Sequence, residues 1–109
     1  MQWEAFFEYA KNGNVEELLS FIQESKIPID IEEPGTGVTP LCVAADAGNL
    51  GVVQMLLDMG ADFKNIKTTN GNTPAHFAAR QGHVKVLQLL ATAGLDLLAV
   101  RNFQVDRRP

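Results

Sequence analysis

The sequence predicts an all-α protein: a solenoid of stacked helix–turn–helix pairs, with short loops or β-hairpins projecting between the pairs. Residues 37–70 placed over residues 71–104 match at 11 of 34 positions, whereas composition alone gives about two matches. The matches fall on glycines, on a Thr-Pro pair and on paired alanines. A second observation is an apolar period of 3.6 residues after the central glycine of each copy. A repeat of about 20–50 residues is typical of proteins whose units bury their apolar faces against one another.

A third, weaker copy of the unit precedes these two. It has an insertion of three residues around Ser25–Pro28. The apolar and glycine positions that it shares with the other copies are Ala10, Gly13, Val15, Leu18, Phe21 and Ile22. Because 109 residues suffice for one domain of ordinary size, we expect a single domain. It comprises a divergent N-terminal capping repeat at about 3–36, repeats at 37–70 and 71–104, and a C-terminal tail at 105–109.

The first helix of each unit is expected to begin at a Thr-Pro pair and to end at a glycine. Thr39 and Thr73 have the side chain of an N-cap residue. Each is followed by proline at the first helical position, where a missing N–H is tolerated. Gly48 and Gly82, like Gly13, are expected to end the helix in the left-handed conformation, which glycine adopts at little cost.

The second helix of each unit is predicted by its apolar residues, which recur with the helical period. We expect its buried stripe at Leu50, Val53, Leu56 and Leu57 in one copy and at Val84, Leu87, Leu90 and Ala91 in the next. Gly60 and Gly94 are expected to end these helices. The stretches that follow, 62–70 and 96–104, are too short and too interrupted for another helix. We expect extended loops or hairpins there.

Composition places the chain among globular proteins that do not span a membrane. Hydrophobic residues make up 46% of it, charged residues 20%, and mean hydropathy is −0.02. No apolar run approaches the roughly 20 residues of a membrane-spanning helix, and the first residues, with Glu4, do not resemble a secretory signal. Cys42 is the only cysteine, so neither an intramolecular disulfide nor a cysteine-rich zinc site is expected. We expect a cytoplasmic protein, with the nucleus as the alternative.

Charge is distributed unevenly along the chain. The net charge is −6 over residues 1–36, −3 over residues 37–63 and +5 over residues 64–109. Nucleic acid is a disfavoured partner, because most of the chain would repel it. The gradient suits a partner with its own charge asymmetry, although chance variation of a solvated surface explains it equally well.

These features together resemble the ankyrin repeat family. The stretch at 37–62 begins Gly-Val-Thr-Pro-Leu-Cys-Val-Ala-Ala and ends Gly-Ala-Asp. The copy at 71–96 carries Thr-Pro-Ala-His and Gly-His-Val at the corresponding places. The resemblance covers about residues 3–104 and implies an ankyrin-repeat solenoid, an L-shaped stack of helix pairs with projecting β-hairpins. It also implies a non-enzymatic module for binding proteins.

The resemblance gives structural roles to the residues that otherwise suggest chemistry. His76 has the histidine position of the family's Thr-Pro-Leu-His motif, where the imidazole bonds the threonine hydroxyl and backbone, and Cys42 has this position one repeat earlier. Equivalent points of adjacent units lie roughly 10 Å apart, beyond the reach of a general base. His83 is expected to form a hydrogen bond at a helix start or to lie on the surface. No phosphate-binding loop, nucleophile elbow or catalytic carboxylate pair occurs, so we expect no enzymatic activity, cofactor, metal or small-molecule substrate.

The family binds its partners through a concave face, formed by the hairpin tips and by exposed positions of the first helices. Transferred to this chain, that face comprises Trp3, Lys11, Asn12, Thr36, Val38, Asp46, Ala47, Thr69, Asn70, Asn72, Arg80 and Gln81. Trp3 is the strongest single candidate, because tryptophan is enriched among binding hot spots. The alternative is that Trp3 only covers the open end of the stack.

The end of the third copy is apolar, whereas a terminal repeat needs a polar outer face. Its large apolar residues are Leu95, Leu97, Leu98, Val100, Phe103 and Val105. Three explanations stay open. The array continues past Pro109, or this end self-associates as a two-fold homodimer, or the tail folds back over its own repeat.

The sequence therefore predicts a non-enzymatic adaptor that binds a protein partner through the concave face. The scaffold does not identify that partner, because recognition depends on the variable surface residues. The alternative is an N-terminal targeting or structural segment of a longer ankyrin-repeat protein, whose activity lies beyond residue 109.

Overall fold

The computed structural model describes residues 3–63, 68–69 and 71–94, without the side chain of Trp3. This part of the chain contains six α-helices and no strand. In chain order the helices are α1 (Trp3–Asn12), α2 (Val15–Ser25), α3 (Pro40–Ala47), α4 (Leu50–Asp58), α5 (Pro74–Gln81) and α6 (Val84–Thr92). Consecutive helices form three pairs, which we call the first, second and third repeats.

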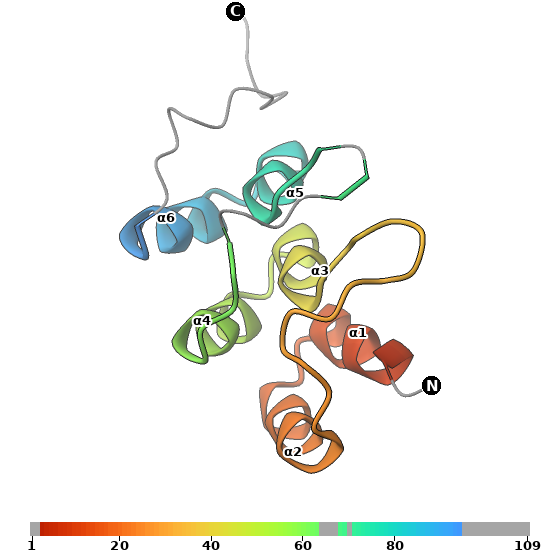
Figure 1. The fold of residues 1–109 in the computed structure, drawn as a ribbon. Coiled ribbons are helices and arrows are strands. Elements are labelled where there is room, and N and C mark those ends of the chain that lie inside the picture. The colour runs from red at the N-terminus through yellow and green to blue at the C-terminus, as the bar shows by residue number, and fades with distance from the viewer. Residues whose placement is uncertain (1–2, 64–67, 70, 95–109) are drawn as a thin grey trace, which may run out of the picture.

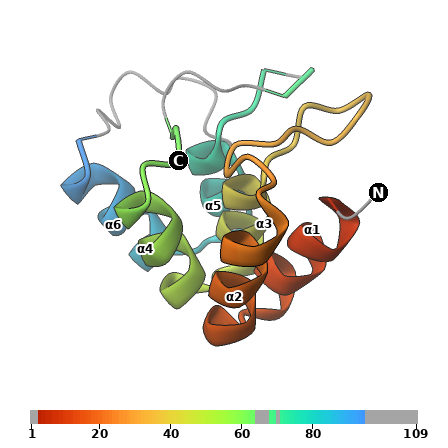
Figure 2. The ribbon, with the colours of Figure 1, turned by 60° about the horizontal axis from the view of Figure 1, so that its bottom comes forward.

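The helices form two layers (Figure 1). The helices that begin each repeat, α1, α3 and α5, lie side by side in an inner layer, and α2, α4 and α6 form an outer layer. The loops that lead from one repeat to the next project beyond the ends of the inner helices (Figure 2). The all-α repeat fold expected from the sequence is therefore confirmed.

The inner helices of the second and third repeats begin where the sequence predicts. The hydroxyl of Thr39 accepts a hydrogen bond from the N–H of Cys42 (3.4 Å), and Pro40 lies in the first turn. Thr73 and Pro74 have the same positions at the start of α5. Both N-caps have extended backbone angles, as expected for a residue that precedes a helix.

The hydrophobic core lies between the two layers. Within the inner layer, the fully buried alanines Ala44, Ala45 and Ala75 have small side chains that let the helices pack closely. Larger apolar side chains fill the space between the layers. Those with at most 1% exposure include Phe6, Leu18, Leu41, Val52, Val53, Leu56, Val86 and Leu90. Removing this apolar surface from water is the main favourable contribution to folding.

The outer helices bury a set of residues that differs from the predicted one. Leu50 and Val84 are 37% and 59% exposed, and Ala91 is also exposed, although all three were expected in the core. Val52 and Val86 are buried instead. Leu50 and Val84 are the first residues of α4 and α6 and border a surface depression. Periodicity failed here because these short helices have apolar residues on more than one face, and only the contact with the inner layer decides which face is covered.

Helix α2 is longer than the other outer helices, with eleven residues against nine. It ends at Lys26, which has a left-handed backbone with φ of 62°. Part of the insertion that the sequence shows around Ser25–Pro28 therefore lengthens this helix rather than the loop after it.

The loops between repeats form fingers that are closed by turns. In the first finger the N–H of Glu33 donates to the carbonyl of Val38 (2.7 Å), and the N–H of Gly37 donates to the carbonyl of Glu33 (3.0 Å). The N–H of Thr69, in the second finger, donates to the carbonyl of Thr36 (2.9 Å). This bond joins the two fingers. Of the two expected forms, loop and hairpin, the described finger residues adopt the loop.

Candidate functional site

The C-terminal ends of the inner helices carry one row of the predicted binding residues. These are the two residues before the glycine that ends each helix: Lys11, Asn12, Asp46, Ala47, Arg80 and Gln81. All are exposed except Asp46, which is half-buried. Because the three helices lie side by side (Figure 2), residues from three distant segments form one row along the stack. We call it the helix-end row.

Hydrogen bonds between repeats hold the helix-end row. Gln81 Nε2 donates to Asp46 Oδ1 (3.1 Å), and His83 Nε2 donates to the carbonyl of Asp46 (2.9 Å). One repeat earlier, Asn49 Nδ2 donates to two carbonyls at the end of α1 (2.9 and 2.7 Å). The last carbonyls of a helix have no partner within the helix. Asn49 and His83 therefore satisfy the inner helix of the preceding repeat, a role of His83 that the sequence did not reveal.

The glycines beside this row are required by conformation and by space. Gly13, Gly48 and Gly82 each have φ of 77°, which confirms the predicted left-handed helix ends. A Cβ on Gly48 would lie 2.7 Å from Cε1 of His83, and one on Gly13 would lie 3.0 Å from Cγ of Asn49. Real Cβ atoms essentially never approach as closely as the first of these distances. Gly13 and Gly48 thus leave room for the side chains that link the repeats, whereas Gly82 is required by its backbone angle alone.

The fingers carry a second row of the predicted residues, which we call the finger row. Its described members are Thr36, Val38, Thr69 and Asn72. The two threonines are exposed, and the other two residues are half-buried. The hydroxyl of Thr36 donates to Glu33 Oε1 (2.6 Å), and the N–H of Asn72 donates to the hydroxyl of Thr68 (3.2 Å). Local hydrogen bonds therefore hold the described part of both fingers.

Other predicted residues lie outside the described part of the chain. Trp3 begins α1, but its side chain is not described, and neither is Asn70. The same holds for the residues predicted to self-associate, Leu95, Leu97, Leu98, Val100, Phe103 and Val105. The roles proposed for them stay predictions.

Between the two rows the inner helices present apolar and charged side chains. Val43 and Phe77 are half-buried at equivalent positions of α3 and α5. The guanidinium carbon of Arg80 lies 5.0 Å from the centre of the Phe77 ring, within the range of a cation–π interaction. At the other end of the layer, Glu8 is exposed on α1. Aromatic residues and arginine are enriched at protein interfaces.

His76 and Cys42 have structural roles at the start of the inner helices. The N–H of Thr73 donates to His76 Nδ1 (2.9 Å), and the hydroxyl oxygen of Thr73 lies 2.8 Å from the same nitrogen. This confirms the expected bond between the imidazole and the Thr-Pro turn. In the second repeat the hydroxyl of Thr39 donates to Cys42 Sγ (3.4 Å). Burial raises the pKa of the Cys42 thiol, which disfavours the nucleophilic thiolate.

The sequence also matches an established family. A family profile described as ankyrin repeats, in three copies, matches residues 6–100. The chain belongs to the ankyrin repeat family. Ankyrin repeats are generally non-enzymatic scaffolds for protein–protein interaction.

Many chains of known structure are similar to this one. Because 403 of them match significantly, this similarity identifies the scaffold and does not discriminate between functions. One is a chain from the structure of the Bd0816 predatory endopeptidase from Bdellovibrio bacteriovorus in complex with immunity protein Bd3460. The identity is 32% and the TM-score is 0.78, over 84% of our chain and 47% of that chain. Our chain therefore spans about half the length of that chain. No curated protein matches the sequence significantly.

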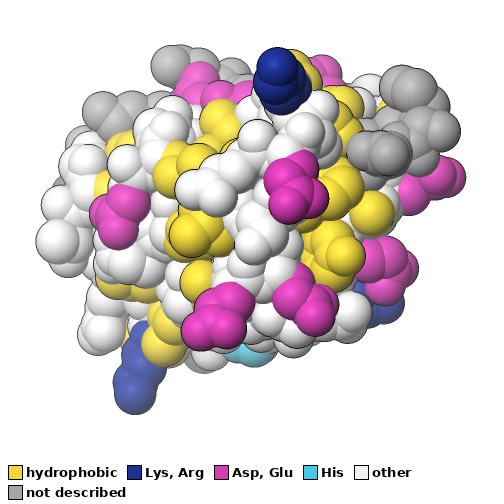
Figure 3. All heavy atoms as spheres, turned by 90° about the horizontal axis from the view of Figure 1, so that it is seen from below, with side chains coloured by type: hydrophobic (Ala, Val, Ile, Leu, Met, Phe, Trp, Pro, Cys, Tyr) yellow, Lys and Arg dark blue, Asp and Glu magenta, His cyan; other side chains and the backbone are white. Residues whose placement is uncertain are grey.

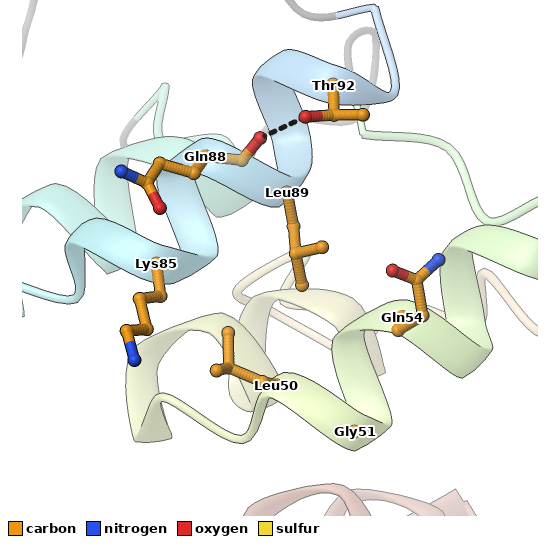
Figure 4. A pocket seen from close by; sticks show the side chains of 7 residues that line it. All are labelled: Leu50, Gly51, Gln54, Lys85, Gln88, Leu89 and Thr92. Atoms are coloured by element: carbon orange, nitrogen blue, oxygen red, sulfur yellow. Dashed lines mark hydrogen bonds between the residues drawn. The ribbon is translucent and has the colours of Figure 1, made fainter.

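The outer layer of the ankyrin stack has a groove that the sequence did not predict. It lies between α4 and α6, has a volume of about 420 Å³, and is lined by Leu50, Gly51, Gln54, Lys85, Gln88, Leu89 and Thr92. Leu50 and Leu89 point toward each other across it (Figure 4). Their side chains make its centre apolar, whereas Gln54, Lys85 and Gln88 make its rim polar. Periodicity placed Leu50 in the core, but its side chain lines this groove instead.

A carboxylate links the first two ankyrin repeats on the side of the fingers. Asp30 accepts the N–H of Asp62 through both oxygens, at 3.1 and 3.3 Å. Burial raises the pKa of Asp30, and the nearby charge of Asp62 acts in the same direction. Within residues 3–63, 68–69 and 71–94, no three His, Cys, Asp or Glu residues are placed to hold a metal ion. None of the helices described there is long and apolar enough to cross a membrane.

Proposed function

We propose that this ankyrin stack is a non-enzymatic adaptor that binds a protein partner through its concave face, formed by the helix-end row, the finger row and the surface between them. The observation that carries the proposal is the network of hydrogen bonds that links these residues across repeats. Asp46 is bound by both Gln81 and His83, and Thr36 is bound to Thr69. A surface held in this way loses little conformational entropy when a partner binds.

Two further observations support a protein as the partner. Arg80 and Phe77 stack on the inner layer, and both residue types are enriched where proteins meet. The matched chain of known structure comes from a complex of an endopeptidase with an immunity protein. A reducing compartment, the cytoplasm or the nucleus, fits a chain whose single cysteine is buried and free.

A second proposal keeps the same surface but gives the chain a smaller role. The chain would be a targeting or structural segment of a longer ankyrin-repeat protein, with the activity located elsewhere. This is favoured by the 47% coverage of the matched chain. In that case the apolar residues after Gly94 would pack against a further repeat instead of a second copy of the chain.

Charge reversal on the concave face tests the leading proposal. Arg80→Glu and Asp46→Arg should weaken capture of the partner, because both residues lie in the helix-end row with opposite charges. The loss should be about tenfold in affinity for Arg80→Glu, since arginine is a frequent hot-spot residue. The measurement is a quantitative pull-down from a cell lysate, in which the same retained protein is compared between variants by mass spectrometry.

The matched controls are on the outer layer. Lys85→Glu and Asp58→Arg make the same charge changes at exposed positions of α6 and α4, and retention should be unchanged. Circular dichroism should show the same helix content in all four variants. If the outer-layer variants lose the partner while the concave variants retain it, the binding face lies on the convex side and the proposal is wrong.

A further inference from the structure

We infer that the end of the described stack formed by α1 and α2 is a second binding surface, which accepts an arginine-bearing segment of a protein partner. The surface is a groove with an aromatic floor and an acidic rim, and we call it the N-terminal groove. It is formed by Ala5, Tyr9, Phe21, Glu16, Glu17 and Glu24. It does not include any residue of the concave face, so this inference is independent of the proposed function.

The floor of the N-terminal groove is a fixed pair of aromatic rings. Tyr9 and Phe21 are half-buried, with ring centres 5.5 Å apart. Phe21 also packs edge-on against the fully buried Phe6, at 5.7 Å. Two depressions of about 430 and 410 Å³ adjoin the pair, and both are lined by Tyr9, Phe21 and Glu24. The rings are therefore held by the core and remain accessible from outside.

The rim of the groove is negatively charged. Glu16, Glu17 and Glu24 are exposed, and none of them forms an ion pair with the described part of the chain. Seen from the side of α2, acidic side chains alternate with apolar ones over this face (Figure 3). Residues 1–36 carry a net charge of −6, and their only bases are Lys11 and Lys26, which do not line the groove. An occupant with positive charge is therefore electrostatically favoured.

The equivalent positions of the other repeats show how completely this face is covered inside the stack. Counted from the glycine that ends the inner helix, Tyr9 corresponds to Ala44 and Ala78, which are fully buried. By the same count Phe21 corresponds to Leu56 and Leu90, which are also fully buried. Within a stack these positions are thus covered completely, whereas Tyr9 and Phe21 keep part of their surface exposed.

One position argues against another ankyrin repeat as the occupant. Glu17 corresponds to Val52 and Val86, which are buried. Stacking a further repeat on this end would remove the Glu17 carboxylate from water, and an unpaired buried charge is strongly unfavourable. A cation that accompanies the occupant offsets part of this penalty. The glutamate at the position where the other repeats have valine therefore favours a basic occupant.

Arginine fits this groove better than lysine does. Its planar guanidinium stacks on aromatic faces and binds a carboxylate through two parallel hydrogen bonds. Phe21 and Tyr9 supply the aromatic surface, and Glu17 or Glu24 supplies the carboxylate. Stacking of a guanidinium on an aromatic ring already occurs on the concave face of this protein, where Arg80 lies over Phe77.

Tyr9 provides a specific probe, because it is the only tyrosine of the chain. The full chain labelled with 3-fluorotyrosine gives one fluorine NMR signal from the groove. We titrate it with a synthetic peptide of alternating arginine and leucine, and with the matched peptides that carry lysine or glutamate in place of arginine. The arginine peptide should shift the signal to saturation, the lysine peptide should bind several-fold more weakly, and the glutamate peptide should leave the signal unchanged.

Variants test the location of binding. Glu17→Lys should weaken the arginine peptide about tenfold, and Glu17→Gln, which keeps the shape of the side chain, should weaken it less. Asp58→Lys makes the same charge change on exposed α4 and should have no effect. Arg80→Glu should also leave this binding intact, which separates the groove from the concave face. The inference is overturned if the arginine peptide fails to shift the signal, if the lysine peptide binds equally well, or if Glu17→Lys has no more effect than Asp58→Lys.

Discussion

At the first repeat junction Asn49 donates to two carbonyls of α1, whereas at the second junction His83 donates to one carbonyl of α3. Both residues directly follow the glycine that ends the inner helix of their own repeat. The backbone around the two junctions is the same, since Gly13 and Gly48 share a φ of 77°. The junctions therefore share one bonded carbonyl position, two residues before the glycine, and reach it with different side chains.

The difference lies in the space that each donor needs. A Cβ placed on Gly48 would lie 2.7 Å from the nearest imidazole atom of His83. A Cβ placed on Gly13 would lie 3.0 Å from the nearest atom of the smaller Asn49 amide. A ring is also less able to move aside than an amide at the end of a short side chain. The comparison teaches that an amide and an imidazole can both supply the donor at this position, and that each sets its own tolerance for substitution at the neighbouring glycine.

The largest effect should come from the core that both junctions share. Leu56 is fully buried in α4, which contacts both α2 and α6. Leu56→Ala should lower the free energy of unfolding by about 2–5 kcal/mol. The equivalent Leu90→Ala should cost less, because within the described residues α6 contacts one neighbouring outer helix, whereas α4 contacts two. Urea denaturation measures both free energies. In a separate thermal melt, a melting temperature that moves by less than about one degree in Leu56→Ala would contradict the repeat register.

Alanine at the three helix-ending glycines directly compares the junctions. Gly48→Ala should destabilise the protein by about 2–4 kcal/mol, because a left-handed backbone angle and a clash with His83 both oppose it. Gly13→Ala should cost less, since Asn49 can shift by a few tenths of an ångström. Gly82→Ala should cost about 1–2 kcal/mol, for the backbone angle alone, as no described atom lies within 4 Å of a Cβ placed there.

The same three variants, measured by thermal and urea unfolding, can also break the comparison. If alanine lowers the free energy of unfolding equally at all three glycines, the backbone angle alone determines that loss and the donors do not constrain the junction. A double variant, Gly48→Ala with His83→Asn, should recover part of the lost stability. The second junction then has an asparagine amide, which is smaller than the imidazole and is the donor used at the first junction.

The smallest effect should be the pH dependence of the Asp30 link at the first junction. Burial holds the folded pKa of Asp30 above its ordinary value of 3.8. The charged form is therefore disfavoured in the folded protein, and this penalty is fully present above the folded pKa and is lost as the pH falls through it. Asp30→Asn still offers an oxygen to the N–H of Asp62 but has no charge to lose.

Stability measured at about pH 6 and about pH 4 tests this. Acidification should stabilise the native sequence relative to Asp30→Asn. Glu32→Gln removes one charge from an exposed position two residues away and is the control. If the difference between Asp30→Asn and the native sequence does not change with pH, the carboxylate is not buried enough to matter.

Local chemistry explains why much of the fold could be predicted from the sequence. A Thr-Pro pair begins a helix and a glycine with a left-handed backbone ends it, whatever lies around them, so Thr39, Thr73, Gly48 and Gly82 were placed correctly. The bond between His76 and the Thr-Pro turn spans only three residues and follows from the motif. Most predicted concave residues are also exposed, because their positions follow from the same helix ends.

The sequence by itself thus determined the number of repeats, their register and the ends of the inner helices, because these depend on interactions within a few residues. Only the tertiary structure decided which face of α4 and α6 is buried, since Leu50 and Val52 are both apolar and only one of them meets the inner layer. It also decided the links through Asn49, His83 and Asp30, each of which joins groups more than 30 residues apart. The aromatic floor of the N-terminal groove was also decided only by the tertiary structure. Phe21 has one of the apolar positions of the repeat pattern, and both Phe21 and Tyr9 remain half-exposed because no described repeat packs on that end of the stack.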